Sequence, residues 1–235
     1  MSLKILFMGT PEFSVPILKS IYESKHKLLA VYTQPPKRKS RGQKIKKSPV
    51  HQYVHNLEIP VKFPEKLNTE NEYNFIKNLK ADIAVVVAYG KILPKRFLDL
   101  PNTIFLNIHA SLLPKWRGAA PIQRSIMNMD KETGISIMKI VEELDAGPLM
   151  KTAKIKIKKN TNTESLREDL SSISASTIID CLDIIENNRQ KFVSQDHSKA
   201  TYAKKIDKSE AKILWNNKAE NIIAKINGLY PDPGC

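Results

Sequence analysis

The segment that most constrains the fold is the run from Asp82 to Ala88, which is continuously apolar after its aspartate. A strand with one wet face alternates polar and apolar residues, whereas a strand covered on both faces does not. The run therefore predicts a central strand of a parallel sheet with helices on either side. Shorter apolar runs alternate with amphipathic segments along the rest of the chain, which favours an α/β fold.

The periodicity of apolar residues predicts the other elements. Strands are expected over residues 4–8, 28–33, 61–63, 103–108, 134–140 and 154–158, and helices over 10–23, 48–57, 72–79, 121–129, 163–187 and 218–227. Pro16 weakens the first of these helices. Gly9 stands alone after the first strand, where a dinucleotide-binding turn needs three spaced glycines, so nicotinamide cofactors are excluded.

Composition limits the function classes. With 235 residues the chain can bury one large core, and 38 basic against 24 acidic residues give a net charge of +14 that attracts polyanions such as nucleic acid. A lysine-rich surface without such a partner would look the same. Two cysteines in no ligand pattern indicate a reducing, cytoplasmic location and no metal. The longest apolar run is far below the roughly 20 residues of a membrane helix, so no membrane contact is expected.

Residues 34–48 form a basic segment that contains no acid and almost no apolar residue. We expect an exposed loop here, placed after a strand on the side where α/β sheets bind ligands. Contact with phosphates is favoured over a merely solvated lysine run. Its seven cations are Lys37, Arg38, Lys39, Arg41, Lys44, Lys46 and Lys47.

The apolar strand over residues 103–108 delivers two unlike polar side chains. Asn107 and His109 are two residues apart, so on a strand they share one face. An amide and an imidazole with no paired serine or cysteine suggest charge stabilisation and proton transfer in acyl transfer. Ser111 is the one nearby candidate nucleophile and has no obvious base. Taken alone, Asn107 could equally be a strand-edge amide, His109 a core histidine and Asp145 a turn residue.

Six motifs are spread along the chain: Phe7–Phe13; Gln34-Pro35 with Arg41-Gly42 and Ser48–Val50; Ala88–Lys91; Asn107–Pro114; Trp116–Gln123; and Leu144–Gly147. Together they resemble the methionyl-tRNA formyltransferases, a family of folate-dependent enzymes. The resemblance implies a Rossmann-like catalytic domain, 10-formyltetrahydrofolate as formyl donor and methionyl-initiator tRNA as acceptor. The implied partners are thus a tRNA and a folate, and a monomer is expected.

The resemblance also assigns residues. Asn107, His109 and Asp145 match the catalytic positions, with Asp145 holding the imidazole and stabilising its charge. Folate contacts are expected from Ser111, Leu112, Leu113 and Pro114 and from Ala88, Tyr89 and Gly90. The tRNA contacts are expected from Arg38, Arg41, Lys44, Lys46 and Lys47.

The domain organisation follows from composition and from the resemblance. We expect a catalytic domain over residues 1–189, a polar linker over 190–205 and the truncated start of a β-barrel, tRNA-binding domain over 206–235. Two rival functions remain. One is another 10-formyltetrahydrofolate-dependent transferase, acting on a sugar-nucleotide amine or glycinamide ribonucleotide, and the other is a non-catalytic RNA-binding module. The basic segment favours tRNA over a small phosphorylated substrate.

Overall fold

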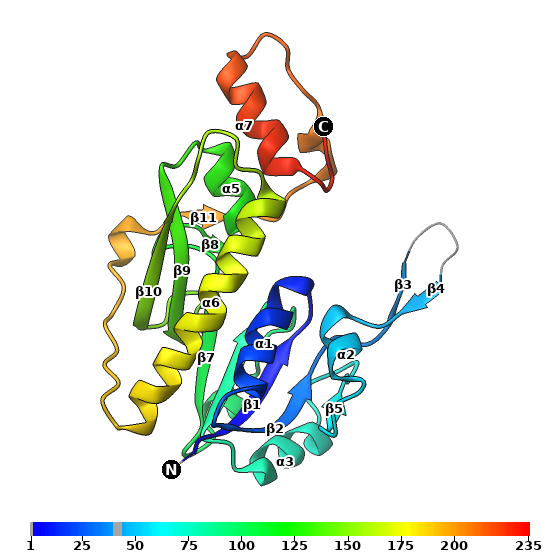
Figure 1. Cartoon of the computed structure of the whole chain (residues 1–235), viewed down its shortest axis with the longest axis vertical. Coiled ribbons are helices and arrows are strands. Elements are labelled where there is room, and N and C mark those ends of the chain that lie inside the picture. The colour runs from blue at the N-terminus through cyan, green and yellow to red at the C-terminus, as the bar shows by residue number, and fades with distance from the viewer. Residues whose placement is uncertain (1, 40–43) are drawn as a thin grey trace. The chain divides into compact units, whose positions relative to one another are not determined.

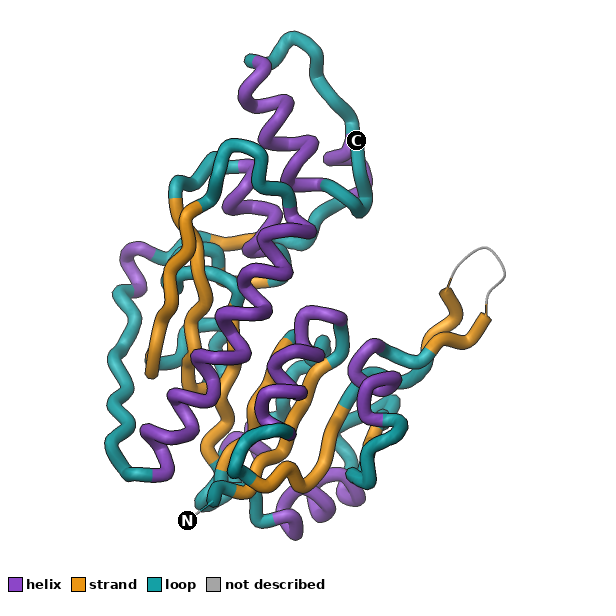
Figure 2. The backbone as a smooth tube through the Cα atoms, in the orientation of Figure 1, coloured by secondary structure: helices purple, strands orange, loops and turns teal. Residues whose placement is uncertain are grey.

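The computed structural model describes residues 2–39 and 44–235, and strands and helices alternate along the chain (Figures 1 and 2). The chain divides into two compact units. The first comprises Met1–Ile108 and Ser174–Lys191, and the second comprises His109–Ile173 and Phe192–Cys235. The predicted α/β class, with a mostly parallel sheet and flanking helices, is confirmed.

The first unit is built on parallel strands. Their spatial order is β7-β6-β1-β2-β5, and each neighbouring pair is parallel; the strands are β1 (Lys4–Gly9), β2 (Lys27–Tyr32), β5 (Val61–Lys62), β6 (Ile83–Val87) and β7 (Ile104–His109). Every residue of β6 is buried, as its unbroken apolar run predicts. Because parallel strands end at the same edge, the loops after β1 and β6 emerge together.

Most helices of this unit lie close to the positions that the sequence predicts, whereas a short one over residues 95–98 was not predicted. The proline that weakened the first helix is accommodated, because a 3-10 turn (Glu12–Ser14) comes first and α1 (Val15–Tyr22) starts just before Pro16, where no backbone donor is needed. The Ser20 hydroxyl of α1 donates to the Ala175 carbonyl of α6 (Thr163–Glu186) at 3.0 Å. The unit also contains α2 (Pro49–Val54), α3 (Glu70–Leu79) and α4 (Lys95–Leu98), of which α2 and α3 are N-capped by Ser48 and Thr69.

The basic segment is more ordered than the loop we expected. Antiparallel strands β3 (Lys37–Lys39) and β4 (Lys44–Lys46) form a small separate sheet, in which Lys37 lies opposite Lys46. Sequence periodicity could not reveal this hairpin, because it has no apolar face that would give an alternating pattern. Residues 40–43, including the predicted tRNA contact Arg41, lie outside the described part of the chain.

An antiparallel pair forms the sheet of the second unit. Strand β9 (Glu132–Lys139) pairs with β10 (Leu149–Lys156), so the last predicted strand begins and ends earlier than residues 154–158. Gly134 of β9 permits this close pairing, because an added Cβ would lie 2.0 Å from the Ala153 carbonyl oxygen. The lysines that alternate with isoleucine lie on the wet face of β10, as predicted.

The second unit also contains α5 (Pro121–Met127), which packs against α7 (Ala219–Leu229). Helix α7 (Ala219–Leu229) reaches α5 through Gly228, where a Cβ would be 2.4 Å from Met127 Cγ. Two short strands that the sequence did not indicate, β8 (Arg117–Gly118) and β11 (Tyr202–Ala203), pair in parallel, and 3-10 turns cover His197–Lys199 and Lys208–Ala211. No helix in the described ranges combines the length and the apolar character that a membrane crossing requires.

A buried histidine in the first unit makes stability depend on pH. His26 accepts the Leu3 N–H at 3.3 Å, and burial lowers its pKa from 6.5, an effect that Lys25 reinforces and Glu186 and Asp183 partly oppose. The unfolded chain therefore binds more protons than the folded chain in this range. We expect the free energy of unfolding to fall as the pH drops below about 6.5.

Urea denaturation at pH values above and below that point tests the expectation. His26→Gln cannot titrate and should show a flatter dependence than the wild type, whereas the same change at the exposed His55 should leave it as it is. Equal pH dependence in His26→Gln and the wild type would contradict the assignment.

Candidate active site

Strand β7 carries two of the three predicted catalytic side chains. Asn107 is half-buried on this strand, and His109 is its last residue, with 6% of its surface exposed. The strand continues the parallel sheet up to its carboxyl edge, so the polar pair lies where α/β folds place their chemistry. Because His109 is buried, the orientation of its ring depends on specific polar neighbours rather than on bulk water.

Each ring nitrogen of His109 faces an oxygen atom. Nε2 lies 2.8 Å from the Trp116 carbonyl oxygen, and Nδ1 lies 3.6 Å from Asp145 Oδ2. A carbonyl and a carboxylate can only accept, and only the imidazolium form can donate from both nitrogens. Nε2 therefore donates to the Trp116 carbonyl, and Nδ1 faces the carboxylate beyond hydrogen-bond distance.

Asp145 is held in an uncommon backbone conformation. Its φ of 51° lies in the left-handed region, which costs a residue with a side chain about 1–2 kcal/mol. Its carboxylate accepts the Gly118 N–H at 2.8 Å through Oδ2, the oxygen nearest His109. The side chain is only 10% exposed. The structure thus brings together the predicted residues His109 and Asp145, which are 36 positions apart by their numbers.

Ser111 has a structural contact that uses its hydroxyl. The side chain is fully buried and donates to the Lys115 carbonyl at 2.6 Å. The neighbouring backbone is engaged as well, because Ser136 Oγ accepts the Leu113 N–H and donates to the Ser111 carbonyl. A ligand of the Ser111–Pro114 segment would therefore contact its side chains, chiefly the half-buried Leu112 and Pro114.

The predicted folate residues after β6 form a tight turn. Ala88 and Gly90 have φ values of 45° and 80°, and the Tyr89 side chain between them is 1% exposed. Burial raises the pKa of the Tyr89 hydroxyl. The Tyr89 carbonyl accepts from Thr10 Oγ1 and Gln34 Nε2. The Tyr89 ring is therefore part of the core, and its backbone carbonyl stabilises the turn.

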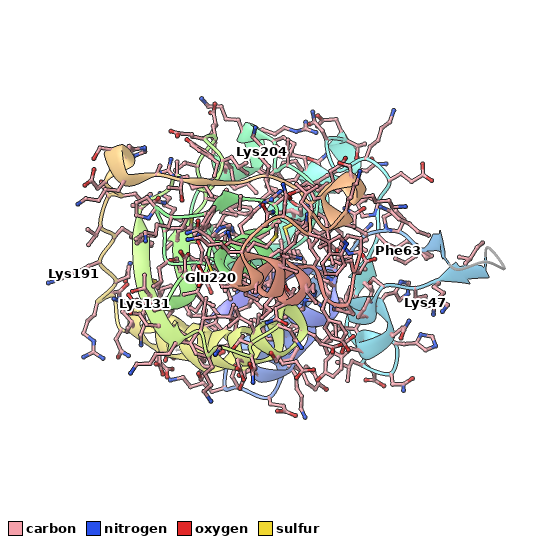
Figure 3. The ribbon with its side chains drawn as sticks, turned by 90° about the horizontal axis from the view of Figure 1, so that it is seen from above. Lys47, Phe63, Lys131, Lys191, Lys204 and Glu220 are labelled. Carbon is pink, nitrogen blue, oxygen red and sulfur yellow. The ribbon has the colours of Figure 1, made fainter. Side chains whose placement is uncertain are left out.

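The predicted tRNA contacts gather at the hairpin. Arg38 and Lys44 lie in β3 and β4, Lys46 is exposed at the end of β4, and Lys47 lies on the surface at the foot of the hairpin (Figure 3). An exposed apolar residue, Ile45, separates two of these cations and is 71% exposed.

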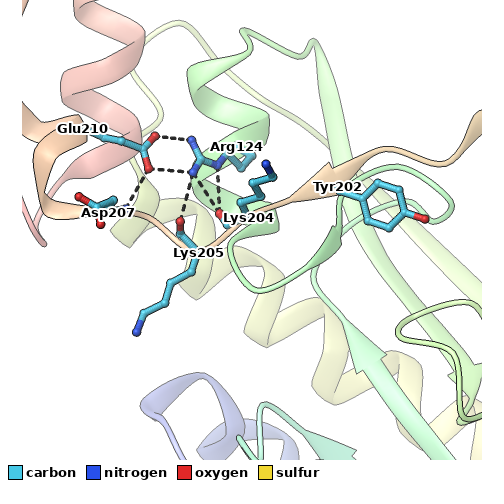
Figure 4. Close-up of a pocket in the computed structure, with 6 residues that line it drawn as sticks. All are labelled: Arg124, Tyr202, Lys204, Lys205, Asp207 and Glu210. Carbon is cyan, nitrogen blue, oxygen red and sulfur yellow. Dashed lines mark hydrogen bonds and ion pairs between the residues drawn. The ribbon is translucent and has the colours of Figure 1, made fainter.

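A shallow cleft in the second unit is lined by charged side chains, two of which pair with each other. Arg124 binds the Glu210 carboxylate through Nη1 and Nη2, at 2.6 and 2.9 Å, and also donates to the Lys204 carbonyl (Figure 4). The cleft is lined by Arg124, Tyr202, Lys204, Lys205, Asp207 and Glu210. The Arg124 guanidinium is therefore already paired, and its contacts with Glu210 link α5 to the C-terminal segment. Among the described residues no three histidine, cysteine or acidic side chains cluster as metal ligands.

Two polar residues near the site were not singled out by sequence reasoning. Arg117, which is 1% exposed, and Gln195, which is 6% exposed, are bonded to each other and lie beside Asp145. Arg117 belongs to the Trp116–Gln123 motif, which was a signal that could have drawn attention to it. Gln195 lies in a polar, irregular segment, and nothing in its sequence context marks it as buried.

A buried histidine thus stands at the end of a parallel strand, with its Nδ1 3.6 Å from a carboxylate oxygen. Residues 3–182 match the model of the family described as formyl transferase. Curated methionyl-tRNA formyltransferases align with the chain over its length: that of Pelagibacter ubique is 55% identical over all of this chain and 76% of the relative. That of Bartonella henselae is 46% identical with the same coverage. The chain belongs to the methionyl-tRNA formyltransferase family.

Solved structures show the same fold at low sequence identity. A 4-N formyltransferase from Francisella tularensis has a TM-score of 0.77 and 19% identity, over 98% of this chain and 89% of that one. An N-formyltransferase from Helicobacter canadensis, in complex with folinic acid and dTDP-3-aminofucose, has a TM-score of 0.75 and 21% identity, over 97% and 80%. At these identities the likeness concerns the fold.

Proposed function

We propose that this chain transfers the formyl group of 10-formyltetrahydrofolate to the amino group of methionyl-initiator tRNA. The observation that carries the proposal is the buried His109–Asp145 pair at the end of β7, with Asn107 two residues before it. The family of the chain supports the reaction class. The free cysteines, Cys181 and Cys235, fit the reducing conditions of a cytoplasmic location.

The chemistry follows from the charges that the reaction develops. The methionyl amine attacks the N10-formyl carbon, a C–N bond forms, and the carbonyl oxygen becomes an oxyanion. The oxyanion collapses as the bond to N10 breaks, N10 gains a proton and the former amine loses one. Asn107 and His109 would donate hydrogen bonds to the oxyanion, because a preorganised donor is worth most where charge appears. Asp145 would orient the ring and balance its charge.

In this scheme the Trp116 carbonyl occupies the His109 donor before the oxyanion forms. It lies 2.8 Å from His109 Nε2 and uses the hydrogen that an oxyanion would need. The substrate oxygen would compete with this carbonyl, and an anion is the stronger acceptor of the two. His109 therefore gains its best partner as the oxyanion forms, which is the differential binding that accelerates a reaction.

The donor assignment rests on the family and on the character of the Ser111–Pro114 segment. The structural neighbour from Helicobacter canadensis was solved with folinic acid, a formylated folate. In this chain the backbone of the segment is tied to Ser136, so its contribution would be an apolar wall formed by Leu112. A pteridine ring would suit such a wall.

We expect folinic acid to bind this chain without tRNA, because small-molecule sites are largely preformed. Leu112→Glu would bring a charge to the apolar wall and should weaken binding at least about tenfold, since desolvating an unpaired carboxylate is costly. Leu214→Glu, at a position 51% exposed, is the matched control and should bind as the wild type does. Isothermal titration calorimetry measures both; absence of heat and thermal shift at millimolar ligand in the wild type would contradict the donor assignment.

The acceptor assignment rests on the hairpin. Pairing places Lys37 opposite Lys46, and like charges directly across an antiparallel pair repel each other. Such an arrangement is relieved by an anion, and a nucleic acid backbone supplies several phosphates in a row. Lys47 at the foot of the hairpin extends the basic surface, and Arg38, Lys44 and Lys46 belong to the same two strands.

A comparison of acceptors tests the proposal against its closest rival. Wild-type chain would be incubated with 10-formyltetrahydrofolate and, in separate reactions, methionyl-tRNA, a dTDP-amino sugar and glycinamide ribonucleotide. We expect formylated methionyl-tRNA as the product and the other acceptors to remain unmodified. Formylation of the amino sugar in preference to methionyl-tRNA would favour a sugar N-formyltransferase, and formylation of none would favour a binding module.

A further inference from the structure

One buried side chain stands out in an otherwise exposed segment. Across residues 191–200, Gln195 is the single buried residue, and its neighbours Ser194 and Asp196 are exposed. A buried amide must satisfy two donors and an acceptor, so its partners reveal what it holds. Its side-chain oxygen accepts from Arg117 of β8, and its side-chain nitrogen donates to the carbonyl of Asp145.

The amide nitrogen of Gln195 holds the loop that carries Asp145. Nε2 donates to the Asp145 carbonyl at 2.9 Å and to the Gly147 carbonyl at 2.7 Å. These two hydrogen bonds lie on either side of Ala146 and fix the loop in which Asp145 adopts its left-handed φ of 51°. The same loop requires glycine at position 147, because a Cβ there would lie 1.8 Å from the Lys139 carbonyl oxygen.

The amide oxygen of Gln195 is held in turn by a buried guanidinium. Oε1 accepts from Arg117 Nε at 3.2 Å and Nη2 at 2.8 Å, and Arg117 Nη1 also contacts Glu143 at 3.2 Å. Because Arg117 can only donate, it fixes which end of the amide faces the loop. The next residue, Gly118, donates its N–H to Asp145 Oδ2.

These contacts close a ring around Asp145. Its carboxylate is held by Gly118, its backbone by Gln195, and Gln195 by Arg117, the residue before Gly118. We propose that Gln195 is a positioning residue that sets the Asp145 carboxylate against His109, an inference that rests on the proposed function for its catalytic consequence. An interchangeable polar residue would not serve, because the position needs a donor pair on one side and an acceptor on the other.

Gln195→Glu is the sharpest variant. The carboxylate keeps an acceptor for Arg117 but cannot donate to the two carbonyls, so the fold retains a partner for its buried cation while the Asp145 loop is released. We expect kcat to fall about 100-fold, as for a small misplacement of a catalytic group, with KM for folate and tRNA nearly unchanged. Gln195→Met, which removes both halves, is the second variant.

Hydrogen exchange tests the position of the Asp145 carboxylate without an activity assay. The Gly118 amide is protected by the Asp145 carboxylate, so releasing the loop should speed its hydrogen exchange in NMR at least about tenfold. Asn216→Asp is the matched control, because it makes the same amide-to-carboxylate change at an exposed position of the same unit. Its Gly118 exchange and its kcat should equal those of the wild type.

A double-mutant cycle separates positioning from a general loss of structure. If Gln195 acts through Asp145, adding Gln195→Glu to Asp145→Asn should cost little further rate. Unchanged Gly118 exchange in Gln195→Glu, or the same proportional loss of rate in the Asp145→Asn background, would overturn the proposal. If the wild type itself transfers no formyl group, the proposed function fails, and the Gly118 exchange alone decides the positioning role.

Discussion

Replacing His109 with alanine is expected to reduce the single-turnover rate of formyl transfer about 10²- to 10³-fold, because the oxyanion loses a preorganised donor. The side chain lies at the end of β7 beside loops, with 6% of its surface exposed, so its removal should leave the sheet intact. Circular dichroism and the thermal midpoint should therefore remain close to those of the wild type. The rate is measured at saturating folate and tRNA, where binding does not limit it.

Asp145→Asn should produce a loss of similar size by a different route. The amide keeps the shape of the side chain but removes the charge that faces His109 Nδ1 at 3.6 Å. Asp99→Asn, at an exposed position in the first unit, is the matched control and should retain full activity. Retention of more than a tenth of the wild-type rate by either active-site variant would show that the pair does not carry the chemistry.

Serine replacements at Lys37, Lys39, Lys44 and Lys46 should have the largest effect on tRNA binding. Each phosphate that the protein neutralises adds roughly 0.7–0.9 to the slope of log affinity against log salt, so removing four cations should lower the slope by about 3. The comparison is made by filter binding or fluorescence over a range of salt, starting at low salt. Affinity for folinic acid should not change.

The wet face of β10 and the turn after it offer a control with the same change in charge. Serine at Lys154, Lys156, Lys158 and Lys159, all exposed, removes four positive charges far along the chain from the hairpin. We expect its salt slope to stay near that of the wild type. Equal slopes in the hairpin variant and the wild type would mean that tRNA docks elsewhere.

The elements that the sequence predicted best are those whose pattern has a single physical explanation. The apolar run of β6 fits a strand covered on both faces, and its residues are all buried. The spacing of Asn107 and His109 on β7 is equally direct, because strand geometry puts alternate residues on one face. The identity of Asp145 as a third partner came from resemblance, since no local pattern links it to His109.

The features that escaped prediction depend on contacts between distant segments. The β3–β4 hairpin has no apolar face, and the parallel pairing of β8 with β11 joins residues 85 apart by number, Arg117 and Tyr202. The burial of Gln195 depends on Arg117 and on the Asp145 loop, which neither sequence neighbourhood records. The left-handed backbone of Asp145 likewise lies in a loop held by Gln195, which is distant in sequence.

The most direct measurement follows a labelled formyl carbon through one turnover. Wild-type chain in excess over methionyl-initiator tRNA is mixed with 10-formyltetrahydrofolate carrying a ¹⁴C-formyl group, and label is counted on tRNA, folate and free formate. We predict that nearly all tRNA becomes labelled with the wild type and almost none with His109→Ala in the same time. Label that remains on the folate, or that appears as formate while the tRNA stays unlabelled, would contradict formyl transfer to tRNA.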